Sequence, residues 1–118
     1  MREFSFPKSN RLKKKKHFQF VYRRGKAVLL PYAVLYVLKG KGLQIGLAVG
    51  KKLGNAVVRN HVKRMMREVF RKNRIKIKAG YHLIWVARHK LVRGNLTCYE
   101  KVFQDLCQKA NLIVNEDG

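Results

Sequence analysis

Residues 55–74 carry the strongest periodic signal in the sequence. Their apolar residues are spaced by four, three and four positions, at Val58, Val62, Met65 and Val69. This spacing places them on one stripe of an α-helix. Asn55 precedes the stripe and is a favoured N-cap residue, because its side-chain oxygen accepts a hydrogen bond from an otherwise free backbone N–H. We therefore predict a helix whose apolar stripe needs a core to cover.

The opposite side of this predicted helix is cationic. On a helical wheel an arc of about 100° contains Asn60, Lys63, Arg64, Arg67, Arg71 and Arg74. A solvated helix face usually places Glu four residues from Lys, but Glu68 is the only carboxylate of this segment. Like charges at these spacings repel each other, so an anionic ligand would stabilise the helix. We favour a phosphate-binding face over a merely solvated one.

The charge of the whole chain indicates the same class of partner. The sequence has 28 Lys and Arg residues against 6 Asp and Glu residues, a formal net charge of +22. Between Phe4 and Tyr99 the only carboxylate is Glu68, so internal ion pairs cannot neutralise most of the surface. A polyanion is the simplest partner for such a chain.

The remaining periodicities predict two further helices. We expect one helix at residues 14–24, ended by Gly25 in the left-handed conformation. We expect the last helix to begin at Thr97, where residues 97–100 match a capping box. Its apolar stripe consists of Tyr99, Val102, Phe103, Leu106 and Ala110.

Short apolar or alternating runs predict strands at residues 27–30, 32–38, 44–49 and 81–87. The glycine-containing turn at residues 39–42 favours a hairpin between the second and third strands. The element order α-β-β-β-α-β-α predicts an α+β fold, a single small domain with helices packed on a small mixed four-stranded sheet. We expect residues 1–118 to form one domain, with an irregular basic arm at 1–13 and a frayed tail at 115–118.

The sequence lacks the residues that a self-sufficient hydrolase needs. Hydrolytic sites use paired carboxylates, a metal cage or an activated nucleophile, and one acidic residue between positions 4 and 99 supplies none of these. The four histidines lack metal-ligand spacing, so we predict no metal site. Cys98 and Cys107 lie too far apart on one predicted helix to form a disulfide.

Membrane association is not predicted either. No run of about 18 apolar residues is present, and the first ten residues lack the apolar centre of a signal peptide. We therefore expect a soluble cytoplasmic protein.

Phe18, Tyr22 and Tyr36 leave two interpretations open. The rings would be stacking platforms for single-stranded nucleic acid if the first helix packs beside the second strand. Ordinary core packing explains their spacing as well. On spacing alone we favour core packing.

Residues 50–70 resemble the signature of bacterial ribonuclease P proteins. The family pattern is a Lys-Lys strand end and a glycine, followed by Arg-Asn-x-x-Lys-Arg-x-x-Arg-Glu on a helix. Here the pattern runs without a gap from Lys51 and Lys52 through Gly54 to Glu68. The resemblance continues at residues 10–12, in the aromatic residues and in the last helix.

The resemblance implies the protein subunit of an RNA enzyme that cleaves the 5′ leader from precursor tRNA. The partners would be ribonuclease P RNA and precursor tRNA, and a protein oligomer is not required. The RNA would hold Mg²⁺ and perform the chemistry, so no residue of the chain is expected to be catalytic. The protein would supply affinity and positioning.

The resemblance also implies where RNA would bind. Contacts to the catalytic RNA would come from Lys51, Lys52, Arg59, Asn60, Lys63, Arg64, Arg67 and Arg71. Contacts to the leader would come from Phe18, Tyr22 and Tyr36. The family fold includes a left-handed β-α-β crossover through the motif helix, an exception to the usual right-handed rule. A structural ribosomal-type RNA-binding protein and a sequence-specific DNA binder are the alternatives, and neither explains the motif.

Overall fold

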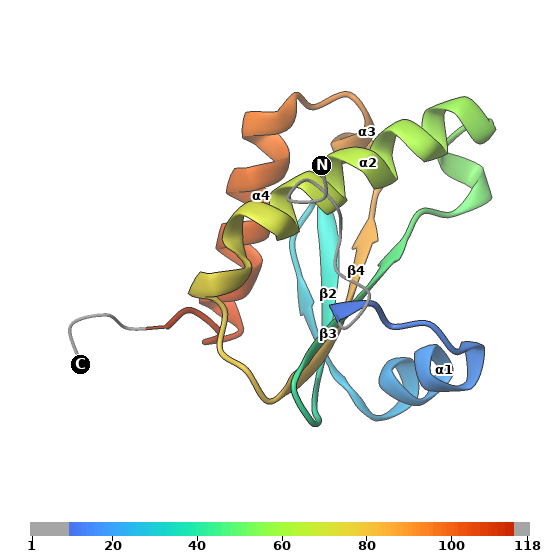
Figure 1. Ribbon diagram of the computed structural model, residues 1–118. Coiled ribbons are helices and arrows are strands. Elements are labelled where there is room, and N and C mark those ends of the chain that lie inside the picture. The colour runs from blue at the N-terminus through green and yellow to red at the C-terminus, as the bar shows by residue number, and fades with distance from the viewer. Residues whose placement is uncertain (1–9, 115–118) are drawn as a thin grey trace, which may run out of the picture.

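A mixed four-stranded sheet forms the middle layer of the protein (Figure 1). The computed structural model describes residues 10–114. In chain order the elements are α1 (Lys15–Arg24), β1 (Lys26–Leu29), β2 (Ala33–Lys39), β3 (Leu43–Ala48), the 3-10 turn η3 (Lys51–Leu53), α2 (Ala56–Asn73), the 3-10 turn η4 (Arg74–Lys76), β4 (Tyr81–Ala87), α3 (His89–Val92) and α4 (Leu96–Lys109). The predicted α+β class and mixed sheet are confirmed, and the short helix α3 is an addition.

The predicted hairpin between β2 and β3 is wrong. The strand order is β1-β2-β4-β3, so β4 lies between these two strands, antiparallel to β2 and parallel to β3. The reason is burial: Leu83, Ile84 and Trp85 of β4 are fully buried, and an apolar strand with both faces covered belongs in the middle of a sheet. The hairpin forms one connection earlier, where Leu30 and Ala33 exchange backbone hydrogen bonds of 3.0 and 3.3 Å.

Helix α2 connects β3 to its parallel neighbour β4, forming the β-α-β crossover. The predicted cap is confirmed, because Asn55 Oδ1 accepts a hydrogen bond of 3.0 Å from the backbone N–H of Val58. Val62, Met66 and Val69 are fully buried against the sheet. The apolar stripe therefore faces the core, as its spacing predicts.

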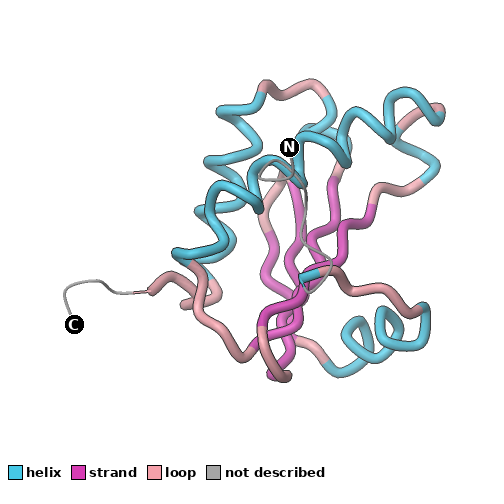
Figure 2. Tube along the Cα trace, in the orientation of Figure 1, coloured by secondary structure: helices cyan, strands magenta, loops and turns pink. Residues whose placement is uncertain are grey.

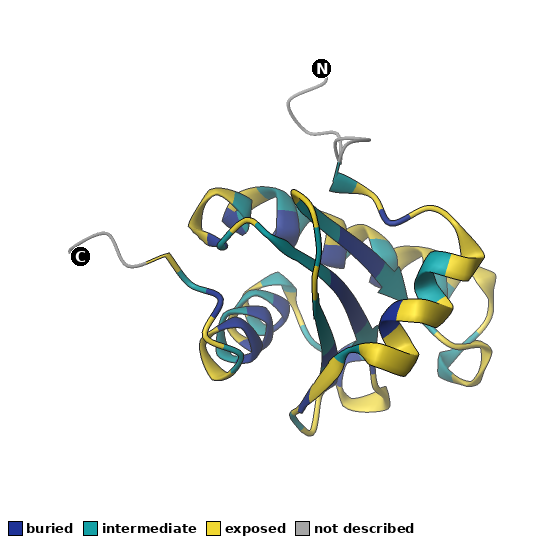
Figure 3. Cartoon of the chain, turned by 90° about the horizontal axis from the view of Figure 1, so that it is seen from below, coloured by how far each residue is buried: buried dark blue, intermediate teal, exposed yellow. Residues whose placement is uncertain are grey.

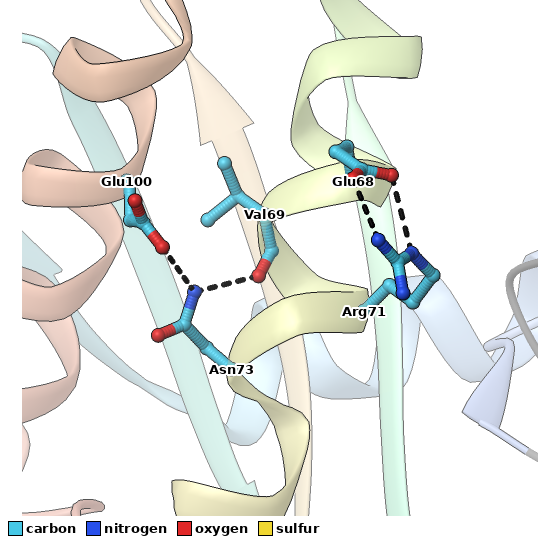
Figure 4. Close-up of polar contacts among 5 residues, drawn as sticks. All are labelled: Glu68, Val69, Arg71, Asn73 and Glu100. Atoms are coloured by element: carbon cyan, nitrogen blue, oxygen red, sulfur yellow. Dashed lines mark hydrogen bonds and ion pairs between the residues drawn. The ribbon is translucent and has the colours of Figure 1, made fainter. Parts of the chain in front are cut away.

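Helix α4 packs beside α2 over the same face of the sheet (Figure 2). The buried Asn73 joins the two helices: its Nδ2 donates to the Val69 carbonyl at 2.8 Å and to Glu100 at 3.4 Å (Figure 4). The predicted cap at Thr97 is wrong, since Asn95 Oδ1 accepts from the Cys98 N–H at 2.9 Å. Thr97 lies inside the first turn.

Helix α1 covers part of the opposite face of the sheet, with its outer side exposed (Figure 3). Its Val21 packs with Ile84 of β4. Gly25 ends the helix as predicted, but in an extended conformation with φ −75° instead of the left-handed one. A glycine is needed there for space, because a Cβ would lie 2.5 Å from the Val21 carbonyl oxygen.

Residues 10–12 lie along the outer edge of β3. The Leu12 N–H donates to the Ile45 carbonyl at 3.0 Å, and Arg11 forms an isolated parallel bridge with Ile45. This part of the predicted irregular arm therefore extends the sheet. Residues 1–9 and 115–118, predicted as the rest of the arm and the frayed tail, lie outside the described residues. No helix within residues 10–114 is long and apolar enough to cross a membrane.

Candidate functional site

The predicted cationic side of α2 faces away from the core. Asn60, Arg64 and Arg67 are exposed, while Lys63 and Arg71 are half-buried. These five residues are called the basic face below. Because the opposite side of the helix is packed in the core, the backbone positions that carry the basic face are fixed before any ligand binds.

Arg71 differs from the other members of the basic face because it forms a bidentate ion pair with Glu68 (Figure 4). Its Nη2 lies 2.7 Å from Glu68 Oε2, and its Nε lies 3.2 Å from Oε1. The hydrogen bond from Arg71 lowers the pKa of the Glu68 carboxyl. Arg71 therefore contributes less net charge to a bound anion than Arg64 or Arg67.

Arg59 has a structural contact at the beginning of the helix. Its Nε donates to the Gly54 carbonyl at 3.1 Å, which ties α2 to the preceding η3 turn. Gly54 has φ 154°, and a Cβ there would lie 2.8 Å from Val58, so glycine is required at this junction. The two lysines predicted to bind RNA, Lys51 and Lys52, lie on η3 and are exposed.

Five of the eight predicted RNA-binding residues border a cavity, in two separate groups. Lys51 and Lys52 border a cavity of about 730 Å³ at the ends of β3 and β4, together with Arg88, His89 and Lys90. These last three residues were not among the predicted site residues. In the sequence they form a basic run directly after the strand predicted at residues 81–87. Only the fold brings this run beside η3.

The second group borders another cleft, at the outer edge of β3. Lys63, Arg64, Arg67 and Glu68 of α2 form one wall of this cleft of about 620 Å³, and Arg11 and Lys13 lie in its lining. Its remaining lining residues are Leu12, Phe18, Ile45, Gly46 and Leu47. We call it the edge cleft.

Phe18, Tyr22 and Tyr36 come together on the α1 side of the sheet. The ring centroids of Tyr22 and Tyr36 lie 4.8 Å apart at an interplanar angle of 84°, and those of Phe18 and Tyr22 lie 6.5 Å apart. Tyr22 is 38% exposed, whereas Phe18 and Tyr36 are half-buried against Val21 and Ile84. Burial and the neighbouring Tyr36 raise the pKa of Tyr22. The trio is thus packed on one side and open on the other.

A histidine pair that the sequence analysis missed ties α1 to the sheet. His17 Nε2 lies 2.8 Å from His82 Nδ1, and His82 Nε2 lies 2.9 Å from the Lys41 carbonyl oxygen. A carbonyl only accepts, so His82 Nε2 carries the proton and its Nδ1 accepts from His17. Within residues 10–114, no three His, Cys, Asp or Glu side chains are grouped so that they could hold a metal ion.

Comparison with known proteins agrees with the motif and the fold. The model of the family described as Ribonuclease P matches residues 6–111. The chain belongs to the ribonuclease P protein family. A ribonuclease P protein component from Clostridium botulinum (strain Eklund 17B / Type B) is 41% identical over 117 residues, covering 92% of this chain and 94% of the relative. One from Alkaliphilus oremlandii is 36% identical over 106 residues, covering 88% and 93%.

Solved structures of the ribonuclease P family share the fold. The RNase P protein of Staphylococcus aureus superimposes with a TM-score of 0.82 at 29% identity, covering 91% of this chain and 100% of the other. That of Thermotoga maritima gives a TM-score of 0.74 at 30% identity, covering 83% and 96%.

Family membership settles the coarse function. The chain is the protein component of a bacterial ribonuclease P, whose holoenzyme is a tRNA-processing endoribonuclease, and the holoenzyme gives it an RNA partner. The structural ribosomal-type alternative finds no support in these comparisons.

Proposed function

We propose that the chain binds ribonuclease P RNA through the basic face of α2 and the 5′ leader of precursor tRNA through Phe18, Tyr22 and Tyr36. The observation that carries this proposal is a separation of chemistry: the cationic face of α2 and the ring pair of Tyr22 and Tyr36 lie on different sides of one small sheet. Phe18 lies between them, in the lining of the edge cleft. Each surface suits a different form of RNA.

The basic face suits a folded RNA. A-form helices hide their base edges in a deep, narrow groove, so a protein recognises their shape and phosphates. Arg64 and Arg67 are exposed and offer planar guanidinium groups that bind phosphate oxygens in a bidentate manner. Lys63 adds a point charge beside them. Because the helix is fixed by its buried stripe, the backbone that carries these groups is already ordered before RNA binds.

The aromatic trio suits a single strand. Unpaired bases stack on aromatic rings, and each stacked base contributes about 1–3 kcal/mol. The T-shaped contact with Tyr36 holds Tyr22 in place, while its exposed fraction leaves ring surface for a base. A precursor carries a leader that can stack here and a mature tRNA does not, so the protein favours the substrate over the product.

The chemical step belongs to the RNA in this proposal. The Mg²⁺ ions of the reaction would be held by the RNA. The chain lowers the repulsion between RNA phosphates by placing its cations among them. The RNA then needs less Mg²⁺ to fold and to bind the precursor. No protein oligomer is required for these contacts.

A salt titration of RNA binding tests the basic face. We expect Arg64→Ala and Arg67→Ala each to weaken assembly with ribonuclease P RNA and to flatten the dependence of log affinity on log salt. Each lost phosphate contact removes somewhat less than one unit of slope. Unchanged affinity and slope in both variants would show that this face is only solvated.

A further inference from the structure

Helix α1 is attached to the sheet by apolar contacts and by one pair of histidines. Val21 is fully buried against Ile84, and Phe18 packs against the same cluster. Apolar contacts of this kind exclude water but are not directional, so they leave a helix free to rotate or slide on a sheet. Among residues 10–114, His17 makes the only side-chain hydrogen bond between α1 and the sheet. This bond is therefore the directional part of the attachment.

His82 of β4 is the partner, and it joins three parts of the chain. Its Nδ1 lies 2.8 Å from His17 Nε2, and its Nε2 donates to the Lys41 carbonyl at 2.9 Å. Lys41 belongs to the turn between β2 and β3, so one imidazole links α1, β4 and this turn. The two histidine rings also meet edge to face, with centroids 4.7 Å apart and an interplanar angle of 68°.

The turn leaves space for the His82 ring only because position 40 is a glycine. A Cβ at Gly40 would lie 2.6 Å from the ring. The turn is itself tied to β4: the Gly40 N–H donates to the Gly80 carbonyl at 3.0 Å, and the Tyr81 N–H donates to the Gly42 carbonyl at 3.2 Å. His82 is therefore held by its own strand and by the turn, and its Nδ1 is directed at α1.

The position of α1 decides where two of the proposed leader-binding rings lie. Phe18 directly follows His17, and its ring lies over Gly46 so closely that a Cβ on this glycine would collide with it. Tyr22 lies one turn further along the helix, with its ring 4.8 Å from that of Tyr36. A rotation or shift of α1 would move both rings together relative to Tyr36, because one helix carries them.

We propose that His82 is a positioning residue for leader binding: through His17 it sets the orientation of α1 and so places Phe18 and Tyr22. It needs no contact with RNA in this role. The inference rests on the proposed leader surface and deepens it, by naming a residue outside the rings that decides how they meet a strand. A pair that only stabilised the fold would not distinguish precursor from mature tRNA.

The first test removes the hydrogen bond from either side. We expect His17→Leu and His82→Leu each to weaken the binding of precursor tRNA to the assembled holoenzyme by about threefold to tenfold, the range of one net hydrogen bond. Binding of mature tRNA should not change, because it has no leader to meet the rings. In cleavage assays the loss should raise KM and leave kcat as in the parent, since the RNA performs the chemical step in the proposed function.

The second test asks whether the two histidines act together. If they do, the double variant should weaken precursor binding no more than the stronger of the two single changes. His17→Gln is the conservative variant, because its amide N–H can still donate to His82 Nδ1. We expect it to keep the parent's affinity for precursor. Single effects that add in the double variant would overturn the pairing.

Asn95→Ala is the control for a loss of stability. Its side chain caps α4 through the Cys98 N–H at 2.9 Å, on the face of the sheet opposite α1. We expect it to lower the melting temperature without changing the preference for precursor over mature tRNA. Histidine variants that melt lower but keep the parent's preference would overturn the positioning role.

Tyr22→Ala distinguishes a failure of this inference from a failure of the proposed leader surface, because it removes a ring and leaves the histidines in place. If Tyr22→Ala weakens precursor binding and the histidine variants do not, the leader surface stands and the positioning role is wrong. If none of the variants weakens it, both are wrong. If only the histidine variants weaken it, they act by a route other than the Tyr22 ring, and the positioning role is again wrong.

Discussion

At the scale of single residues, Tyr36 shows why the two roles of an aromatic side chain are hard to separate. It is half-buried among Leu12, Val21 and Ile84, as a core residue is, and its ring also supports Tyr22 at 4.8 Å on the open side. One residue thus packs the α1 side of the sheet and shapes the proposed leader surface.

Replacing Tyr36 by Ala should affect both properties. We expect a loss of about 1–3 kcal/mol in affinity for precursor tRNA, the size of one base–ring stack, with little change for mature tRNA. We also expect a loss of folding stability, smaller than the roughly 3–5 kcal/mol of a fully buried aromatic residue because Tyr36 is only half-buried. Melting curves and binding to precursors of stepped leader length measure the two effects.

Tyr36→Phe serves as the control, because it keeps the ring and removes the hydroxyl. A Tyr36→Ala variant that melts lower but binds every leader length as the parent does would end the stacking role for this residue.

The His17–His82 pair should make stability depend on pH. Burial, followed by the neighbouring His82 and Lys14, lowers the pKa of His17 below its ordinary value of 6.5. As the pH falls, the unfolded chain therefore takes up a proton at His17 at a higher pH than the folded chain does. The contribution of neutral His17 to the free energy of unfolding is complete above pH 6.5. It is lost as the pH falls through the lower pKa of His17 in the folded chain.

We expect the free energy of unfolding to decrease on acidification less steeply in His17→Gln than in the parent. Denaturant titrations from about pH 7.5 to about pH 5 measure this difference. His61→Gln, at an exposed position on α2, is the control and should behave as the parent does. Equal pH dependence in the parent and in His17→Gln would contradict the assignment.

Residues whose partners are close in the sequence could be predicted, and those with distant partners could not. Asn55 was predicted as a cap because its partner is three residues away. Thr97 was predicted as the cap of the last helix, and Asn95 caps it instead, because Asn95 has the extended backbone of an N-cap residue, with φ −91° and ψ 178°. Asn10 bonds to Arg74 across 64 positions and His17 to His82 across 65, so neither contact leaves a local pattern.

At the scale of elements, one side of α2 packs in the core and the other carries the basic face. Glu68 lowers the net positive charge of the basic face. The carboxylate pairs with Arg71 at the surface, where such a pair contributes only about 0–1 kcal/mol to stability. The pair also reduces the charge that Arg71 offers to a bound anion. The helix is therefore less cationic than its arginine content indicates.

We expect Glu68→Gln to strengthen binding to ribonuclease P RNA and to steepen its salt dependence by somewhat less than one unit. Asp105→Asn is the matched control, since it removes the same charge from a surface pair on α4. Charges beyond about 10 Å are largely screened at moderate salt, so this control should change the slope much less. Equal effects of the two variants would mean that only net charge matters.

Strand positions could be predicted from the sequence, but strand order could not. The short apolar and aromatic run after Gly80 predicted β4 with its observed bounds, residues 81–87, because such a run is a local signal. The turn at residues 39–42 predicted a hairpin, because a short glycine turn usually joins paired strands. The central place of β4 depends on which strand gains most from being covered on both faces, and this is decided by the whole sheet.

At the scale of the whole molecule, the core holds the elements together and the positive charge attracts RNA. The core joins α2 and α4 to one face of the sheet, and the smaller α1 cluster closes part of the other. A chain of net charge +22 repels itself, so RNA binding relieves a cost that the isolated fold carries. Affinity for RNA should accordingly be high at low salt and fall steeply as salt rises.

The most direct test of the account is cleavage of precursor tRNA at low Mg²⁺ by the chain alone, by its ribonuclease P RNA alone, and by both together. We expect that the chain alone leaves the precursor intact, that the RNA alone cleaves poorly, and that the mixture cleaves efficiently at the leader junction. Adding Mg²⁺ should restore cleavage by the RNA alone. Cleavage by the RNA-free chain, or a mixture no better than the RNA alone, would contradict the claim that this protein supplies binding and positioning while the RNA supplies the chemistry.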